Sequence, residues 1–485
     1  MSKILIRTGL TPFDELDITD VIANNLIGGN SGNLIYANSL FRSLMIDRET
    51  EIVPDRYMQN EFSALQINEE YDRYVIALAD MFRKGASFEI NRMKALIKAL
   101  KIPCTIVGVG LRANSLKEID EGFTFDNNVR SFVSAVLDKS AMIGIRGELT
   151  GKYLTKLGFK EDRDFMVIGC PSMFTYGGEL KRKEININKD SFISVNSSIL
   201  SPQSAINFCC KILDEYENSV FIPQRIDELK TLYLGCDYIH ETVRKNYPDK
   251  ATDKIYTDGR VKMFLQANQW INYLSGADLS IGARLHGNVA AILAGTPTVI
   301  MPHGLRMKEI IEYHGLPHIY PDKLKTCKTL EDVLEKVDFD LMFKKHAENF
   351  ERYKTFLKAN SIETIYDKDY VPYDDMIKEV KGDYSVPSML NLTPYELANR
   401  FDEVYVRKHM DSGARYRVMY KYAAALNNTR ITTDIRMLGK KATDKIKHQK
   451  RSNTARYQEI KAARAAKNAV EEPLEANQTN ENNNE

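Results

Sequence analysis

The feature of this sequence that most restricts its fold is an alternation, seen twice, of short apolar segments with segments of helical periodicity. The first series begins with the apolar segment at residues 3–7 and ends near residue 168, and the second runs from residues 192–196 to residue 301. Short apolar runs bounded by Gly and Pro are typical of parallel strands that are buried on both faces. The sequence therefore predicts an α/β fold with doubly wound parallel sheets.

The two series predict two Rossmann-like domains, at residues 1–180 and 190–365, joined by a polar and charged linker. A chain of 485 residues is also too long for one ordinary hydrophobic core. Because ligands of such folds bind outside the carboxyl ends of the strands, we expect a cleft between the two domains to hold the site. Residues 366–404 contain Pro and Tyr without clear periodicity, so we expect an irregular connector there.

The end of the chain differs from the rest in its charge. Residues 405–470 hold 17 Lys and Arg against 4 Asp and Glu, whereas Asn and Glu dominate residues 471–485. We expect residues 405–485 to form a basic, partly helical extension with a disordered acidic tail. Three interpretations of the basic part stay open: a solvated extension, peripheral contact of residues 405–470 with an anionic membrane, or contact with a nucleic acid or an acidic partner. Of these partners, nucleic acid is the one that we do not expect.

The sequence shows no targeting segment and no membrane span. No apolar run approaches the ~18 residues that a span needs, and the N-terminal residues lack the apolar core of a signal peptide. The six cysteines are scattered without metal-ligand spacing, which favours reduced thiols. These features predict a cytoplasmic protein without a bound metal, in one interpretation peripheral at the inner face of the membrane.

Residues 278–302 carry the most specific signal for function. Their pattern predicts a buried strand at 278–282, a turn that contains Arg284 and His286, and a helix from about residue 288. The turn would place a fixed cation and a titratable imidazole beside a helix N-terminus, whose free N–H groups favour anions. Because Arg284 and His286 are two residues apart in an extended turn, we expect both to face the same side. The sequence therefore predicts an anion site with its own acid–base group.

Further candidate residues share a position near the end of a predicted strand, or in the glycine-rich loop IGGNSGN that opens a helix at residue 34. Each has a structural alternative, because Asn and Ser cap helices and turns, and an Arg can pair with a neighbouring carboxylate. The loop lacks the Lys-Ser/Thr of a P-loop, so by itself it is a weak phosphate signal. The candidates are Asn30, Asn33, Arg112, Arg146, Asn196, Ser197, Gln224, Leu285, His303 and Arg306.

Three segments together resemble the polysaccharide pyruvyltransferase family. They are GARLHGNVAAILAGTPTVI at residues 282–300, IGIRGELTGKYLTKLG at 143–158 and VIGCPSMF at 167–174, and their order and spacing are similar as well. The chain departs from the family's pattern at Asn33, where members often have Asp, and at Cys170, where many have Asp. The resemblance extends to about residue 316 and implies two Rossmann-like domains in a glycosyltransferase-B-like architecture.

The resemblance implies transfer of a pyruvyl group from phosphoenolpyruvate to a sugar, with formation of a pyruvate ketal and release of phosphate. The acceptor would be a cell-surface polysaccharide, such as capsule or exopolysaccharide, or its lipid-linked precursor. A donor with a phosphate and a carboxylate needs at least two cations, and its methylene carbon needs a proton donor. We therefore expect Arg284 and Arg146 to hold the donor, and His286, with a pKa near ~6.5, to protonate it at neutral pH. No cofactor is expected.

Two other functions stay open from the sequence. A nucleotide-sugar-dependent glycosyltransferase of the same architecture would use Arg284 and the helix N-terminus to bind a diphosphate. A non-catalytic member of the fold would act through the basic extension instead. A serine hydrolase is disfavoured, because the sequence has no Gly-x-Ser-x-Gly elbow.

Overall fold

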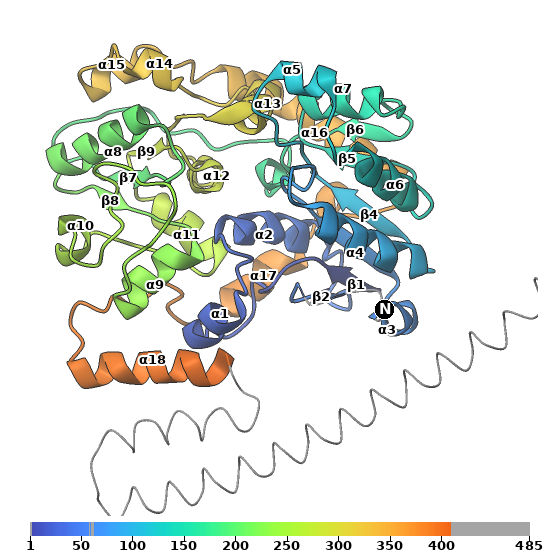
Figure 1. The fold of residues 1–485 in the computed structure, drawn as a ribbon, viewed down its shortest axis with the longest axis horizontal. Coiled ribbons are helices and arrows are strands. Elements are labelled where there is room, and N and C mark those ends of the chain that lie inside the picture. The colour runs from blue at the N-terminus through green and yellow to red at the C-terminus, as the bar shows by residue number, and fades with distance from the viewer. Residues whose placement is uncertain (1, 58, 60–62, 409–485) are drawn as a thin grey trace, which may run out of the picture. The chain divides into compact units, whose positions relative to one another are not determined.

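The computed structural model describes residues 2–57, 59 and 63–408. Its contacts divide the chain into residues 1–397, which we call the body, and residues 398–485. In the first half of the body, four strands form a parallel sheet in the order β2-β1-β3-β4 (Figure 1). The strands of this half are β1 (Lys3–Ile6), β2 (Glu51–Pro54), β3 (Arg73–Ala77), β4 (Cys104–Val107), β5 (Ile143–Ile145) and β6 (Phe165–Val167).

The strands β5 and β6 form a parallel pair, and a backbone bridge between Val109 and Ile145 joins that pair to the end of β4. In the second half of the body, another parallel sheet has the order β10-β9-β7-β8. Its strands are β7 (Ile193–Asn196), β8 (Val220–Phe221), β9 (Leu279–Gly282) and β10 (Thr298–Ile300).

Counted within each half, both four-stranded sheets have the order 2-1-3-4. In a sheet of this order the chain adds strands first on one side of the initial strand and then on the other. Ligands of such folds bind at that switch point, between the first and third strands and beyond their carboxyl ends. The topology therefore predicts one crevice beside β1 and β3 and another beside β7 and β9.

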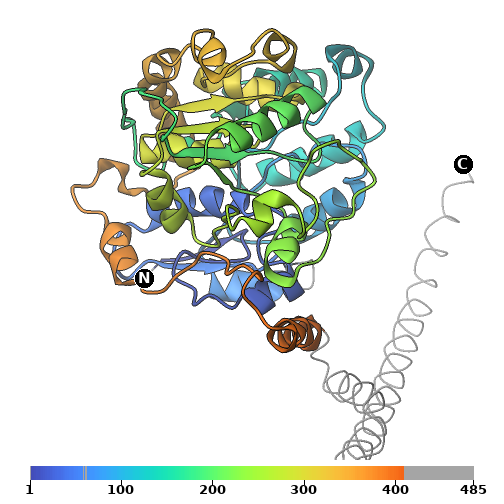
Figure 2. The same cartoon turned by 90° about the vertical axis from the view of Figure 1, so that its left-hand side faces the viewer.

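Helices connect the strands and pack against the sheets, as α8 and α12 do on the second sheet (Figure 2). The helices of the first half are α1 (Ile18–Asn24), α2 (Gly32–Leu44), α3 (Ala64–Glu70), α4 (Ser87–Ala99), α5 (Leu116–Glu121), α6 (Asp126–Leu137), α7 (Glu148–Lys156) and the 3-10 helix η2 (Pro171–Phe174). The later helices are α8 (Gln203–Glu215), α9 (Ile226–Leu234), α10 (Lys254–Thr257), α11 (Ala267–Leu274), α12 (Leu285–Ala294), α13 (Gly304–His314), α14 (Pro321–Leu324), α15 (Leu330–Leu334), α16 (Leu341–Ala359), η3 (Ile365–Asp367), α17 (Pro372–Glu379) and α18 (Pro394–Lys408).

Helices α2 and α12 join the two halves of the body. Nearly every residue of each is buried, and α12 is apolar on all sides, which is typical of a central helix. The two helices contact each other, and α11 contacts both (Figure 1). Leu40 of α2, Val289 of α12 and Trp270 of α11 belong to one hydrophobic core. The two halves therefore share a core. The N-terminal ends of α2 and α12 lie close together, with Gly32 against His286.

The predicted fold class, α/β with two Rossmann-like halves, is confirmed. The domain boundaries at residues 180 and 190 stay a prediction. The expectation of an irregular connector at residues 366–404 is wrong in part, because α17 and most of α18 lie there. Pro372 begins α17, where its fixed φ suits the first helical position. Residues 409–485, which include most of the predicted basic extension, lie outside the described residues.

Three local predictions also differ from the structure. The edge strand β2 was not predicted, because Glu51 and Pro54 interrupt any apolar run. The segment before the glycine-rich loop contains α1, which Asp17 caps by accepting a hydrogen bond from the backbone N–H of Asp20. The predicted extended turn around His286 is wrong: Arg284 is the extended N-cap residue, and His286 lies in the first turn of α12.

Candidate functional site

A cavity of about 310 Å³ lies at the carboxyl edge of the second sheet. It occupies the predicted switch point, because residues that follow β7 and β9 form part of its wall. Asn30 and Arg112 reach it from the first half of the body. We call it the His303 cavity. The second half contributes Ser198, Gln224, Arg225, Arg284, Leu285, His286, His303 and Arg306.

The wall of the His303 cavity is strongly basic. Four arginines line it, and no Asp or Glu is found among the described residues that line it. Two of these arginines, Arg284 and Arg225, follow strands of the second sheet, while Arg112 and Arg306 come from the loop after β4 and from α13. Such a wall attracts a ligand that carries more than one negative charge.

Arg284 is fixed from behind by three groups. Its backbone N–H donates to Asn196 Oδ1 at 2.9 Å, and its Nε donates to the carbonyl of Ser197 at 2.8 Å. Its terminal nitrogen lies 3.4 Å from the carboxylate of Glu228, whose side chain is fully buried. The same carboxylate accepts the backbone N–H of Gln224 at 2.8 Å. The charge that balances Arg284 is therefore kept out of the cavity, and the guanidinium is held in place at the wall.

His286 is buried, with 7% of its surface exposed, and is packed on several sides. Its Nε2 lies 3.6 Å from Cys170 Sγ, and its ring stacks on Tyr36 with 6.4 Å between ring centroids. A Cβ on Gly32 would lie 2.9 Å from His286 Nδ1, so only glycine leaves room for the ring there. With Nε2 facing Cys170, Nδ1 is the nitrogen left to serve a ligand.

The pKa expected for His286, near ~6.5, is wrong. Burial, reinforced by the charges of Arg146 and Arg306, lowers the pKa of His286 to about 3. The ring is therefore neutral at neutral pH. An anionic ligand in the cavity would oppose these effects, so protonation of His286 depends on what binds beside it.

Arg146 does not reach the wall of the His303 cavity. It is fully buried, its Nε donates to the carbonyl of Gly108 at 2.6 Å, and its guanidinium lies over the Tyr36 ring at 5.5 Å. One of its terminal nitrogens has no hydrogen-bond partner among the described residues. From this position Arg146 adds positive charge behind His286, and the structure shows no pairing with Glu148.

Two other predicted residues, Asn196 and Ser197, are buried and support Arg284 without lining the cavity. Gln224 does line it, and its side-chain nitrogen has no partner among the described residues. Asn30 lines the cavity while its side chain accepts the backbone N–H of Gly32 at 2.8 Å, as in a helix cap. Leu285 supplies an apolar part of the wall.

A second cavity, of about 510 Å³, lies at the carboxyl edge of the first sheet. Arg7 follows β1, Arg56 and Tyr57 follow β2, and Asp80 and Arg83 follow β3. We call it the Arg83 cavity. It shares Asn30, His286 and Arg306 with the His303 cavity, and it also contains Asn33. The two cavities therefore meet at the imidazole.

Asp80 and His303 show how charge is distributed where the two cavities meet. Asp80 pairs with Arg306 at 2.8 Å and lies 3.5 Å from Arg112. Although burial opposes them, these arginines hold the pKa of Asp80 below its usual value. Burial, followed by the charges of Arg306 and Arg284, lowers the pKa of His303 to about 4. Both histidines of the site are thus neutral bases at neutral pH.

Five residues that line the Arg83 cavity were not predicted from the sequence: Arg7, Arg56, Tyr57, Asp80 and Arg83. A usable signal existed for Arg7 and Asp80, which lie just beyond β1 and β3, where the rule for parallel sheets places ligands. No such signal existed for Arg56 and Tyr57, because the strand before them was not recognisable.

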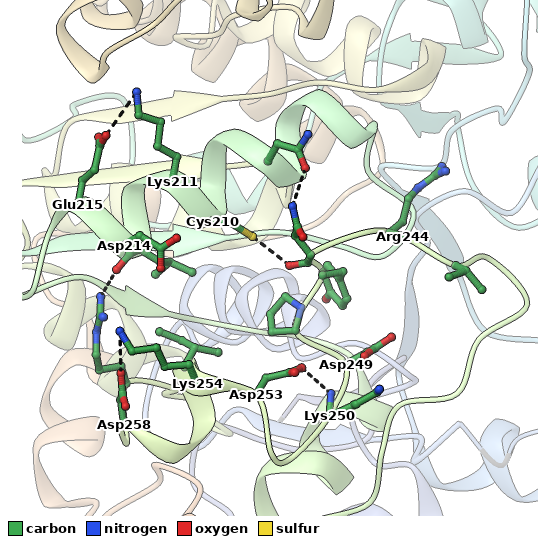
Figure 3. A pocket seen from close by; sticks show the side chains of 18 residues that line it. Cys210, Lys211, Asp214, Glu215, Arg244, Asp249, Lys250, Asp253, Lys254 and Asp258 are labelled. Atoms are coloured by element: carbon green, nitrogen blue, oxygen red, sulfur yellow. Dashed lines mark hydrogen bonds and ion pairs between the residues drawn. The ribbon is translucent and has the colours of Figure 1, made fainter.

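A third cavity is larger than both, with about 990 Å³, but its chemistry is different (Figure 3). It lies between α8 and residues 243–260, and five basic and five acidic side chains line it. Several pair with each other, as Lys211 does with Glu215 at 3.4 Å and Lys254 with Asp258 at 3.8 Å (Figure 3). We call it the α8 cavity. Its charges cancel, so size alone does not identify the anion site.

The described part of the chain contains no group of three or more His, Cys, Asp or Glu side chains placed to hold a metal ion. None of the described helices combines the length and apolar character that crossing a membrane requires.

Comparison with solved structures finds weak similarity. Staphylococcus aureus MnaA, solved with UDP, is 12% identical over 75% of this chain and 99% of its own, with a TM-score of 0.38. A UDP-GlcNAc 2-epimerase from Neisseria meningitidis, solved with UDP-GlcNAc, is 10% identical over 78% and 99%, with a TM-score of 0.34. A functionally uncharacterised protein of Klebsiella pneumoniae is 13% identical over 64% and 88%, with a TM-score of 0.34. These values carry no information about the reaction.

A search of curated proteins finds no match to this chain. In contrast, a family model described as polysaccharide pyruvyl transferase matches residues 32–304. The match begins at the N-terminus of α2, beside His286, and runs through Arg112, Arg284 and His303. It thus includes most of the wall of the His303 cavity. The chain is a member of the polysaccharide pyruvyl transferase family.

Proposed function

We propose that the protein transfers the pyruvyl group of phosphoenolpyruvate to a sugar of a cell-surface polysaccharide or of its lipid-linked precursor. The product is a pyruvate ketal, and phosphate is released. One observation carries this proposal: four arginines and two histidines surround the His303 cavity, and no carboxylate is among its described lining residues. We place the reaction in the cytoplasm. Peripheral contact of residues 405–470 with an anionic membrane is part of this proposal.

The donor suits the His303 cavity in charge and in size. Phosphoenolpyruvate carries a phosphate and a carboxylate, and guanidinium groups bind both through paired hydrogen bonds. A volume of about 310 Å³ is at the small end for ligand sites, as expected for a donor of this size. Arg284, Arg112 and Arg306 are the groups that we assign to hold it, with Arg146 adding positive charge from behind.

His286 acts as the acid in the proposed reaction. The methylene carbon of the donor takes the proton from imidazolium, which leaves positive charge on C2 that the attached oxygen shares. One sugar hydroxyl adds to C2 and returns its proton to His286. The bond from C2 to the phosphate oxygen then breaks, the second hydroxyl adds, and its proton leaves with phosphate. Two hydroxyl protons thus end on the methyl group and on phosphate, and His286 is restored.

The low pKa of His286 fits this scheme only if binding of the donor raises it. Phosphoenolpyruvate brings negative charge close to the ring and offsets the field of Arg146 and Arg306. Binding of the donor and protonation of the acid are therefore coupled.

The direct test is to incubate the protein with phosphoenolpyruvate and oligosaccharide or lipid-linked acceptors, and to follow phosphate release and the mass of the sugar. We expect one phosphate for each pyruvyl group added. The variant Lys254→Ala, which alters the α8 cavity, serves as the control and should react like the wild type. Consumption of a nucleotide sugar without any use of phosphoenolpyruvate would overturn the proposal in favour of a glycosyltransferase.

A further inference from the structure

The Arg83 cavity is also basic, and the donor proposed for the His303 cavity does not account for it. Its described lining includes five arginines and two carboxylates, Asp80 and Glu89. Three of the arginines are balanced: Arg7 by Glu89 at 3.0 Å, Arg56 by Asp14 at 2.8 Å, and Arg306 by Asp80 at 2.8 Å. What remains is the charge of Arg83 and Arg92.

Neither the Arg83 nor the Arg92 side chain forms an ion pair or a hydrogen bond with the described residues, although Arg83 is close enough to Asp80 to help lower the pKa of that carboxyl. Both are partly buried, Arg83 in the loop before α4 and Arg92 within that helix. Partly buried arginines without a directly paired carboxylate are costly unless a ligand or water satisfies them. The cavity thus has two positive charges that the protein leaves unpaired.

The position of this cavity is that of a substrate site. It lies at the switch point of the first sheet, where Arg7 follows β1 and Asp80 follows β3. The backbone at Arg56 and Tyr57 has φ values of 53° and 58°, a left-handed conformation that side chains other than glycine seldom adopt. Strain of this kind is concentrated at ligand sites, because the surrounding structure must hold it. Here it presents a guanidinium and a phenol ring to the cavity.

The Arg83 cavity also meets the donor at the reacting group. His286, Asn30 and Arg306 line both cavities, so two ligands bound in them would come together at the imidazole. Its volume of about 510 Å³ exceeds the 310 Å³ of the His303 cavity, as a sugar larger than the donor requires. A neutral sugar would leave Arg83 and Arg92 unpaired beneath it.

We infer that the Arg83 cavity binds the acceptor through a phosphate ester or diphosphate on the sugar, held by Arg83 and Arg92. This inference rests on the proposed function for the identity of the second substrate. Guanidinium groups bind phosphate oxygens in pairs, and the two unpaired arginines match the charge of one such group. Both a nucleotide and a polyprenyl chain can carry a sugar through a diphosphate. The two arginines would bind that diphosphate in either carrier.

The binding test uses inorganic pyrophosphate as the probe and isothermal titration calorimetry of the full chain. Protein saturated with phosphoenolpyruvate should still bind pyrophosphate, and Arg83→Gln/Arg92→Gln should weaken that binding by about 10-fold to 100-fold. The matched control is Arg163→Gln, since Arg163 is exposed and pairs only with its neighbour Asp164. Pyrophosphate that merely competes with phosphoenolpyruvate, or binds the double variant unchanged, would overturn the inference.

The kinetic test compares a neutral oligosaccharide, a nucleotide-linked sugar and a polyprenyl-diphosphate-linked sugar that share the same terminal residue. We expect a KM for at least one diphosphate-bearing acceptor that is about 10-fold or more below that of the neutral one, and the carrier that reacts identifies the source. Equal KM values for all three acceptors would refute the phosphate-binding subsite while leaving the pyruvyl transfer intact. Conversely, pyrophosphate binding that depends on Arg83 and Arg92, without any use of phosphoenolpyruvate, would reject the proposed function and keep the anion site.

Discussion

The His303 cavity and the Arg83 cavity occupy equivalent places in two sheets of the same strand order, yet their walls differ. In the second half of the body, the carboxylate of Glu228 balances Arg284 from behind and is fully buried. In the first half, Asp80 and Glu89 stand in the wall itself and balance Arg306 and Arg7 from within.

The different positions of the carboxylates show how one strand order can support two binding sites with different charge. The sheet order determines where a crevice opens, and the loops after the strands determine its charge. A cavity without carboxylates suits a small donor with several charges, whereas a larger and partly balanced cavity suits a sugar with one acidic group. The α8 cavity shows the third case, in which charges cancel and no such preference arises.

The largest effect that would sharpen this comparison is expected at His286, which lines both cavities. His286→Gln should lower turnover by about 10²-fold to 10⁴-fold, because a general acid is lost, while phosphoenolpyruvate still binds the arginines. Steady-state kinetics with calorimetric binding measures both quantities. His240→Gln is the matched control, since His240 lines none of the three cavities named here. A variant at position 286 with more than half of the wild-type turnover would remove His286 from the mechanism.

The second prediction tests whether the buried carboxylate of Glu228, which lies behind the His303 cavity, destabilises the protein once Arg284 is removed. Arg284→Met leaves Glu228 buried without the cation 3.4 Å away, which should cost about 3–5 kcal/mol of the free energy of unfolding. Adding Glu228→Gln should recover part of this loss. Urea unfolding measures the effect.

The control for Arg284→Met is Lys254→Ala in the α8 cavity. Lys254 is 80% exposed in its side chain and pairs with Asp258 at 3.8 Å, so its loss should change the free energy of unfolding by less than about 1 kcal/mol. Equal effects at positions 284 and 254 would show that Glu228 does not depend on Arg284.

The third prediction concerns the contact that joins the two halves. In Gly32→Ala, the new Cβ would lie 2.8 Å from His286 Cβ, so α2 or the ring must shift. Displacement of a catalytic group by a fraction of an ångström should lower turnover by about 10-fold to 100-fold, with a smaller effect on stability. Gly276→Ala is the control, because the nearest atom to its Cβ would be at 3.5 Å. Unchanged turnover in Gly32→Ala would mean that the position of the ring is not critical.

The smallest predicted effect is the uptake of a proton when the donor binds. Because burial, Arg146 and Arg306 lower the pKa of His286 to about 3, the ring is neutral near neutral pH. The anionic donor should raise that pKa, so binding takes up as much as one proton through His286. Affinity for phosphoenolpyruvate should then fall as pH rises through the pKa of the bound state.

Calorimetry in buffers of different ionisation enthalpy measures this uptake. The donor's own phosphate also titrates, so the quantity to compare is the difference between the wild type and His286→Gln at the same pH. If both proteins exchange the same number of protons on binding, the donor does not protonate His286, and another acid must be sought, with His303 as the next candidate.

Some of this site could be predicted from the sequence. Arg284 and His286 follow a strand and begin a helix, and that pattern is visible in the apolar spacing of residues next to them in the chain. The α/β class and its two halves were predictable for the same reason, since periodicity is a local property. Arg56 and Tyr57 were not, because β2 is a short edge strand with Glu51 and Pro54 at its ends.

The sequence by itself therefore determined the fold class, the two α/β halves and the strand that ends at the Arg-Leu-His segment. Only the tertiary structure decided that Arg146 is buried behind His286, that Glu228 balances Arg284 out of reach of the cavity, and that Arg83 lines the second cavity. The physical reason is the range of the interactions. Helix and strand periodicity depends on near neighbours in the chain, whereas burial and the field at a titratable group depend on residues that the fold brings from distant segments.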